Sequence, residues 1–541
     1  MGSLANTTGI TPAQLLSVET YTDAQSKTNP YFWIVTAKLR TRLDHRPWSP
    51  QFSDLFLTLK AKIVLGFKDK ESLLYDPNEL RILLARRIRT RVYLCGGPGD
   101  QNPPDRNPEF NRRYVEAGES IVFLDYRGTG GSVQVTNAAG DLDQDCMRFM
   151  RLLRPQDHAA DGKTALADDN VDRLTGFLKL CRQDSIIRDL EAIRLALLPL
   201  GQRWHIFGQS YGGWLSLTYL SLCPKGLADS TITAGLAPIT VSVDTTYRAL
   251  FKVVIGRNDL YYTTYPEDVK RVKTITLHLL SQETPSDTGI ELPRGGLLTA
   301  QRFLSLGRVL GNRARFAQVH NLIKAMSRDL ETSSPLTLDS LANFERVDTW
   351  KFDERPVYAL LHEAMYCRQG EVSNWSAERV SMEFPQYTWV ARDEISGRNW
   401  REALIKNCAR DAPKVYFSGE MVYPFHFRTY RALRPLVEVA DRLAKHRWDE
   451  QTYSARQLRA NQVPVYAVSY TSDMHVHPRL SEETATCVAG IEHEVLDVAN
   501  GKLLEHGSVR SHTAEVMGKI DGLRAGYWSR RGQMDPTGNT W

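Results

Sequence analysis

The stretch WHIFGQSYGGW, residues Trp204–Trp214, predicts a buried strand, a tight turn and the start of a helix in quick succession. Its centre is the pattern G-x-S-x-G, with Ser210 as the serine. In such a turn the serine holds a strained backbone conformation, and Gly208 and Gly212 are needed because a side chain there would collide with neighbouring backbone. Gly213 lets the following helix approach closely. We therefore expect Ser210 to be an exposed nucleophile at the end of a strand.

Other apolar runs that end in turn residues predict the rest of a sheet. Continuous runs such as VYL, IVFL and VYAV are typical of strands that are buried on both faces, which favours a parallel sheet covered by helices. A helical pattern, with apolar residues three and four positions apart, covers Asp184–Leu198. The expected strands lie within Thr90–Gly99, Ser120–Ser132, Arg203–Gly213, Asp229–Ile239, Val463–Asp473 and His493–Gly501.

Between residues 241 and 450 the strand signals give way to helical patterns. Because strands resume afterwards and need a sheet to join, we interpret this region as a helical cap inserted into one core rather than as a tandem domain. The core would comprise residues 43–240 and 451–541. Residues 1–42 are expected to form an N-terminal extension, either a mobile arm or a helix on the surface. The fold class is thus α/β, an α/β-hydrolase fold with a mostly parallel central sheet flanked by helices and a large helical cap.

A serine nucleophile needs backbone N–H groups that bind the oxyanion formed during acyl transfer. One donor should be Tyr211, the residue after the nucleophile. The second should come from a loop after an earlier strand, and the loop Cys95–Gly99 has the sequence CGGPG. Pro98 has no N–H, so the donor precedes it, and we predict Gly97.

The serine also needs a base, and the base needs an acid that orients it. In this fold the chain order is serine, acid, histidine. Asp473 ends an expected strand, and His506 lies in the loop after the last one. The other histidines considered are His475 and His477, too near Asp473; His493, which precedes the last strand; and His512, which lies in the final helix. We predict the triad Ser210, Asp473 and His506.

Composition limits the other functions of the chain. A net charge of +5 over 541 residues argues against nucleic acid or an anionic membrane as a partner. Seven widely spaced cysteines with no C-x-x-C pair argue against a disulfide framework or a zinc site. We find neither a secretory signal nor an apolar run long enough to span a bilayer. The expectation is a cytoplasmic protein without a metal.

Together these motifs resemble those of the proline iminopeptidases, the prolyl aminopeptidase family of α/β hydrolases, and most closely their long fungal-type branch. The resemblance covers residue 43 to the C-terminus. It includes the segments GGPG, DYRGTGGS, GQSYGG, TAGLAPI, YPEDVKRV, LLHEAMYC, NWSAERV, FSGEMVYP and NQVPVYAVSYTSDM. It implies a helical cap, no metal or organic cofactor, and cleavage of an N-terminal residue, often proline, from small peptides.

The same resemblance implies a binding site for the free amine of the substrate. In the family, glutamates of the cap hold this amine, and the matching positions here are Glu363 and Glu420. A protonated amine in a closed pocket needs such an opposing charge. Alternatively, both glutamates cap helices or join structural ion pairs. The chain departs from the family pattern at Cys95, where His or Gln is usual, at Tyr126, where Gln is usual, and at His475, where Tyr is usual.

Three functions remain open from the sequence. The leading one is an aminopeptidase that acts through an acyl-enzyme on small peptides. The second is a hydrolase or acyltransferase of the same fold that acts on a small-metabolite ester, thioester or amide in a biosynthetic pathway, which the changed residues near the site favour. The third is a binding protein with an inactive triad, against which the complete triad argues. The oligomeric state stays unknown.

Overall fold

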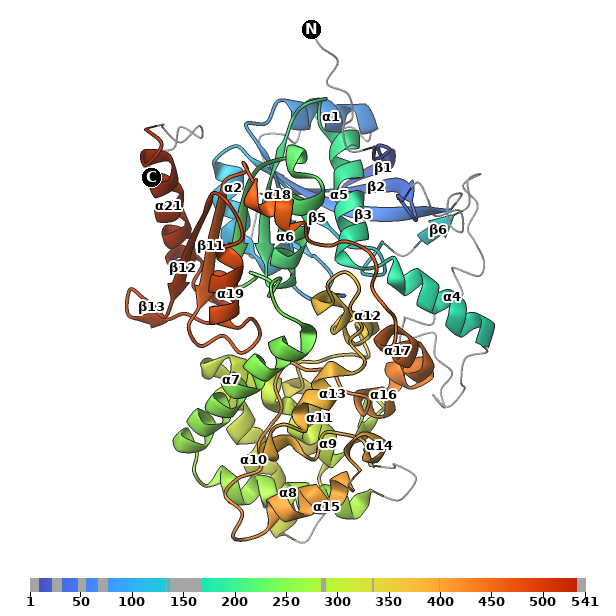
Figure 1. Ribbon diagram of the computed structural model, residues 1–541, viewed down its shortest axis with the longest axis vertical. Coiled ribbons are helices and arrows are strands. Elements are labelled where there is room, and N and C mark those ends of the chain that lie inside the picture. The colour runs from blue at the N-terminus through green and yellow to red at the C-terminus, as the bar shows by residue number, and fades with distance from the viewer. Residues whose placement is uncertain are drawn as a thin grey trace.

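The structure is a computed structural model that describes residues 9–21, 32–46, 55–66, 76–132, 134–136, 168–283, 289–332, 335–397 and 399–532. Within these residues a ten-stranded sheet forms the centre of one lobe (Figure 1). Its order is β1-β2-β3-β5-β4-β7-β8-β11-β12, and β6 pairs with β3. The strands are β1 (Gln14–Tyr21), β2 (Phe32–Arg42), β3 (Phe56–Gly66), β4 (Thr90–Leu94), β5 (Ser120–Leu124), β6 (Gln134–Thr136), β7 (Trp204–Gln209), β8 (Leu227–Thr233), β11 (Val465–Tyr470) and β12 (Ile491–Leu496).

The six strands expected from the sequence are β4, β5, β7, β8, β11 and β12, and they pair in parallel. In β4, β5 and β11 every residue is buried, which explains why their sequences are continuously apolar. Because parallel strands end at one edge, the loops after β4, β7, β11 and β12 gather there. This edge is where the predicted triad and oxyanion donors come together.

For the described parts of residues 1–42, the expectation of a mobile arm or a surface helix was wrong. β1 and β2 extend the sheet by antiparallel pairing, β1 with β2 and β2 with β3. In β2, the side chains of Val35, Ala37 and Leu39 are fully buried, and Lys38 is exposed. This short, mostly apolar and buried run is the signal that places the segment in the sheet.

Helices cover the sheet in two groups. α5 (Gln183–Leu197) packs against α6 (Tyr211–Leu222), which lies on β4, β7 and β8. α2 (Pro108–Glu116) and α21 (Thr513–Ser529) are joined by an ion pair between Arg113 and Asp521 with a nitrogen–oxygen distance of 2.5 Å. The remaining core helices are α1 (Pro77–Ala85), α4 (Asp168–Lys179), α18 (Ala455–Arg459), α19 (Pro478–Ala485) and α20 (Ser508–Ser511).

The chain between β8 and α18 forms the second lobe, which we call the insert. It is mainly helical and lies below the sheet lobe in Figure 1. Its helices are α7 (Val243–Thr264), α8 (Asp268–Gln282), α9 (Ala300–Leu304), α10 (Phe316–Glu331), α11 (Leu338–Val347), α12 (Pro356–Leu361), α13 (Ser376–Ser381), α14 (Asp393–Ser396), α15 (Trp400–Cys408), α16 (His426–Thr429) and α17 (Val437–Ala444).

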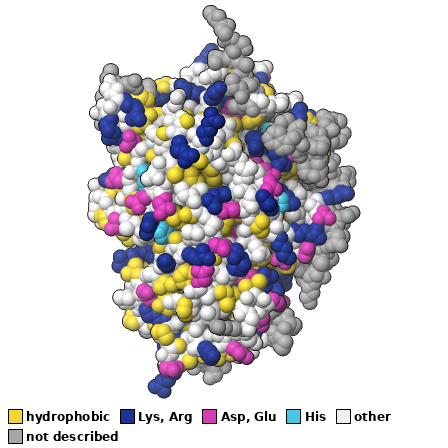
Figure 2. Space-filling view, viewed as in Figure 1, with side chains coloured by type: hydrophobic (Ala, Val, Ile, Leu, Met, Phe, Trp, Pro, Cys, Tyr) yellow, Lys and Arg dark blue, Asp and Glu magenta, His cyan; other side chains and the backbone are white. Residues whose placement is uncertain are grey.

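Basic and acidic side chains are interspersed over the face shown in Figure 2. Among the described residues, the search for an apolar helix of membrane-spanning length found none.

Candidate active site

Ser210 lies on the turn between β7 and α6 and has a strained backbone. Its φ and ψ angles are 55° and −124°, a conformation that L-residues other than glycine rarely adopt. A Cβ atom added to Gly208 would lie 2.3 Å from the carbonyl oxygen of Gly212, and one added to Gly212 would lie 2.0 Å from that of Leu94. The glycines of the G-x-S-x-G pattern are thus required by close backbone contacts, as the sequence predicted.

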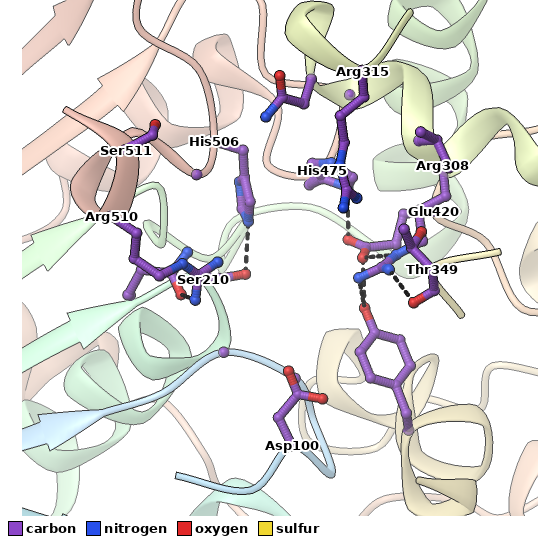
Figure 3. Close-up of a pocket in the computed structure, with 18 residues that line it drawn as sticks. Asp100, Ser210, Arg308, Arg315, Thr349, Glu420, His475, His506, Arg510 and Ser511 are labelled. Carbon is purple, nitrogen blue, oxygen red and sulfur yellow. Dashed lines mark hydrogen bonds and ion pairs between the residues drawn. The ribbon is translucent and has the colours of Figure 1, made fainter. Parts of the chain in front are cut away.

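The three residues predicted as a triad form one hydrogen-bonded chain. The Oγ atom of Ser210 lies 2.9 Å from Nε2 of His506 (Figure 3). Nδ1 of His506 lies 2.8 Å from Oδ2 of Asp473. The other oxygen of Asp473 accepts hydrogen bonds from the backbone N–H groups of His475 (2.8 Å) and Val476 (3.0 Å). Burial alone would raise the pKa of Asp473, but the charge and hydrogen bond of His506 outweigh it and hold the pKa below its usual value. The arrangement can transfer a proton from Ser210 to His506 while Asp473 stays charged.

The loop that carries His506 is held from the insert. Arg257 of α7 forms an ion pair with Glu505, the residue just before His506. The second carboxylate oxygen of Glu505 accepts a hydrogen bond of 2.9 Å from the backbone N–H of Arg313, also in the insert. Both lobes therefore determine where the imidazole of His506 lies.

Of the predicted oxyanion donors, Tyr211 directly follows Ser210 in the chain, and Gly97 lines the same cavity as Ser210. Tyr211 is the first residue of α6, where a backbone N–H has no partner within the helix. Gly97 lies in the loop after β4 and, together with Ser210, lines a cavity of about 420 Å³. Its φ angle of 129° is one that favours glycine. The positions fit the predicted roles.

Glu420 lines the same cavity, opposite the serine (Figure 3). One of its oxygens accepts hydrogen bonds from Nε of Arg308 (2.8 Å) and from the hydroxyl of Tyr358 (2.5 Å). The other lies 3.0 Å from Nδ1 of His475. Burial would raise the pKa of Glu420, but the charges of His475 and Arg308 hold it well below the ordinary value. Glu420 is therefore a charged carboxylate that faces the nucleophile.

Glu363, the other glutamate predicted to bind the amine, is not among the described residues that line this cavity. Its carboxylate accepts hydrogen bonds from the backbone N–H groups of Ser376 (3.2 Å) and Ala377 (2.9 Å), at the start of α13. Burial raises the pKa of Glu363 to about 7 despite these bonds. The structure thus places Glu363 where the alternative from the sequence put it, at a helix terminus.

Two further groups bear on the chemistry. Burial raises the pKa of the Cys95 thiol to about 12, so this cysteine is a small buried side chain rather than a second nucleophile.

In the insert, Glu267, Asp268 and His320 lie close enough to share a metal ion. Asp268 already accepts a hydrogen bond of 2.6 Å from Tyr261 and pairs with His320 at 2.9 Å, and the three lie outside the cavity of Ser210.

The sequence reasoning did not identify several charged residues at the cavity. Arg308, Arg315 and Arg510 all line it. His475 lines it too, and the sequence placed this residue near the site because it departs from the pattern of the family that the chain resembles. The arginines gave none, since their segments carry no motif and meet the site only in the folded chain.

Together the fold and the site define a class. A mainly parallel sheet, a serine on the turn from strand to helix, and an aspartate and a histidine after later strands are the features of an α/β hydrolase. No family model matches the chain. It is, however, 30% identical over 430 residues to a proline iminopeptidase of Aeromonas sobria, covering 79% of this chain and 86% of the relative. The chain belongs to the proline iminopeptidase family.

A second curated relative agrees with this assignment. The chain is 28% identical over 437 residues to the proline iminopeptidase aneH of Aspergillus aculeatus, covering 80% of this chain and 84% of the relative. Among solved structures, VinJ matches with 12% identity and a TM-score of 0.34 over 87% of this chain and 95% of its own. A proline iminopeptidase of Mycobacterium smegmatis matches with 11% identity and a TM-score of 0.34 over 88% and 97%. Scores this low carry no inference about function.

Proposed function

We propose that the protein is a serine aminopeptidase that releases an N-terminal proline, or a similar small residue, from short peptides. The observation that carries the proposal is the hydrogen-bonded chain Ser210–His506–Asp473, which shares one cavity with the charged Glu420. Membership of the proline iminopeptidase family supports it. The residues alone would fit many acyl-transfer reactions, so the carboxylate facing the serine is what favours a substrate with a free amine.

The proposed reaction proceeds through an acyl-enzyme. His506 takes the proton of Ser210 as its oxygen attacks the carbonyl carbon of the first peptide bond. The N–H groups of Gly97 and Tyr211 bind the oxyanion, and the start of α6 adds partial positive charge there. His506 then gives its proton to the leaving amine. Water, deprotonated by the same imidazole, releases the N-terminal residue and restores Ser210.

Glu420 takes the role of amine receptor in this proposal. The ammonium of the substrate lies against a carboxylate that is buried and already shared with Arg308 and His475. A carboxylate has about four lone-pair positions, so it can accept from the substrate as well. An acetylated N-terminus would lose the charge and add bulk, and therefore we expect such substrates to be rejected.

The first experiment is steady-state hydrolysis of prolyl-4-nitroanilide, its N-acetylated form and 4-nitrophenyl butyrate by the wild type and Ser210→Ala. Cleavage of the free prolyl substrate, absent with the acetylated one and lowered by about 10³-fold or more in Ser210→Ala, would agree with the proposal. Ester cleavage without prolyl cleavage would refute the peptidase and keep the triad. Equal activity in both proteins would refute the role of Ser210.

A second candidate is a hydrolase or acyltransferase for a small-metabolite ester, thioester or amide. The observation that favours it is that both oxygens of Glu420 already have partners, namely Arg308, Tyr358 and His475. If these partners neutralise Glu420 fully, a free amine gains little from the site. The ester substrate in the same assay separates the two candidates.

A further inference from the structure

Among the charged side chains that line the cavity of Ser210, some form ion pairs and others do not. Its two acids are both paired, Glu420 with Arg308 and His475, and Asp100 with Arg355. Of its three arginines, Arg308 is paired and the other two, among the described residues, are not. In the described part of the chain, no carboxylate forms an ion pair with Arg315 or Arg510, and the polar contact found for Arg510 is a long one of 3.5 Å to the side-chain oxygen of Gln209. The unpaired charge in the cavity is therefore positive.

These two arginines come from different lobes. Arg510 belongs to α20, which follows the loop of His506, and lies on the side of Ser210 in Figure 3. Arg315 belongs to a short 3₁₀ turn of the insert, Arg313–Arg315, and lies on the side of His475. Both side chains are exposed and line the same cavity. Partial burial and the nearby charge of Arg308 lower the pKa of Arg315. An anion bound at Arg315 would offset the repulsion from Arg308.

The lining offers little apolar surface for a proline ring. Among the lining residues only Val309 and Tyr358 have mostly hydrocarbon side chains, and the hydroxyl of Tyr358 is bound to Glu420. Most ligand pockets are lined mainly by apolar groups with a few polar ones. A cavity of about 420 Å³ with this lining fits a small ligand that is recognised by its charges.

We propose that the substrate is a zwitterion of dipeptide size, whose leaving amino acid carries a free carboxylate that Arg510 and Arg315 bind. This inference rests on the proposed function and narrows it from peptides in general to dipeptides and comparable conjugates of an amino acid. His506 protonates the leaving amine, so the leaving group lies on the side of His506, and α20 places Arg510 on that side. Guanidinium groups are suited to carboxylates because they can donate two parallel hydrogen bonds.

The test compares prolylglycine with prolylglycinamide, which differ in the terminal charge. For the wild type we expect kcat/KM to be about tenfold higher for the free acid, as charge-assisted hydrogen bonds at a partly exposed site would give. The acid-to-amide ratio should fall toward one in Arg510→Gln and in the double variant with Arg315→Gln. It should also fall as salt is added, because the attraction is screened. Because each ratio compares kcat/KM for two substrates of the same protein, a general loss of activity in a variant cancels.

Arg313→Gln is the matched control. Arg313 is, like Arg315, an exposed arginine of this 3₁₀ turn, but it does not line the cavity. It contacts Glu505 through its backbone N–H, which the substitution retains. The acid-to-amide ratio should stay at the wild-type value. An equal drop in Arg313→Gln would mean that overall charge, not a carboxylate site, sets the preference, and would overturn the proposal.

Two further outcomes separate this inference from the proposed function. Hydrolysis of prolyl-4-nitroanilide with no preference for the free acid would overturn the carboxylate site and leave the aminopeptidase intact. If no prolyl substrate is cleaved, the aminopeptidase fails, and N-acetylglycine and N-acetylglycinamide are compared as inhibitors of ester hydrolysis. Stronger inhibition by the acid, lost in Arg510→Gln, would support the carboxylate site. Equal inhibition would overturn it.

Discussion

Glu363→Gln tests whether Glu363 caps a helix or binds the substrate. The glutamine is nearly the same size and keeps one oxygen that can accept from the backbone N–H of Ala377. It cannot ionise. The substitution therefore removes the energetic cost of a buried negative charge while leaving most of the local contacts in place.

The size of the effect follows from the pKa of Glu363, which burial raises from an ordinary 4.5 to about 7. A carboxyl group with a raised pKa in the folded chain makes its full contribution to stability below pH 4.5, and that contribution is lost as pH rises through 7. The loss corresponds to about 3 kcal/mol of unfolding free energy in the wild type. Glu363→Gln has no such group, so its stability should gain about 2.5 kcal/mol relative to the wild type between pH 5 and pH 8, since the unfolded carboxyl is already partly ionised at pH 5.

The assay is urea unfolding of both proteins at pH 5 and pH 8, followed by tryptophan fluorescence. The difference in unfolding free energy between variant and wild type is taken at each pH, and the two differences are then compared. Any pH-independent cost of the substitution cancels in this comparison. Glu402→Gln, at an exposed position of α15, is the control and should show no such gain. Parallel pH dependence of wild type and Glu363→Gln would refute the reasoning. A large rise in KM for prolyl-4-nitroanilide in Glu363→Gln would instead favour the amine-binding role.

Three further predictions concern the elbow, the sheet edge and the cavity. Gly213→Ala should abolish soluble expression, because an added Cβ would lie 2.0 Å from the carbonyl oxygen of Gly235. Gly518→Ala, with no atom within 4 Å of the new Cβ, should instead stabilise α21. Its free energy of unfolding in urea should rise by about 0.5–1 kcal/mol. Deletion of residues 1–42 should give aggregated protein in sedimentation, because the edge of β3 loses its partner β2; a soluble, active truncation would contradict this. Glu420→Gln should raise KM for prolyl-4-nitroanilide by about tenfold or more and leave KM for 4-nitrophenyl butyrate within about twofold; an equal change for both substrates would argue against amine binding.

The sequence predicted the parallel half of the sheet because a strand buried on both faces is apolar throughout. Every residue of β5 and β11 is buried, and their sequences show it directly. β1 alternates buried and exposed residues, and in β2 the exposed Lys38 interrupts the buried run, so both strands give a weaker signal. β3 was missed for the same reason, since Lys60 and Lys62 interrupt its apolar residues.

At the site, the sequence predicted the residues that follow a local rule. Ser210 sits in a contiguous motif, and Asp473 and His506 follow from the order of strands and loops. The partners of Glu420 follow no such rule. Arg308, Tyr358 and His475 come from three separate segments, and only the packing of the insert on the core brings them to one carboxylate. For Glu363 the opposite holds: its motif matches the family pattern, but its carboxylate accepts hydrogen bonds from the backbone N–H groups of Ser376 and Ala377.

The ion pair between Arg257 and Glu505 has a consequence for how this enzyme can be altered or shortened. It ties the histidine loop of the core to a helix of the insert, so the two lobes are not interchangeable parts. A chimera with the insert of a relative would need a residue that pairs with Glu505. Without that residue, the loop of His506 would lose a contact that holds it in place. Substrate preference and catalytic competence are thus inherited together, through a contact that touches neither the substrate nor the nucleophile.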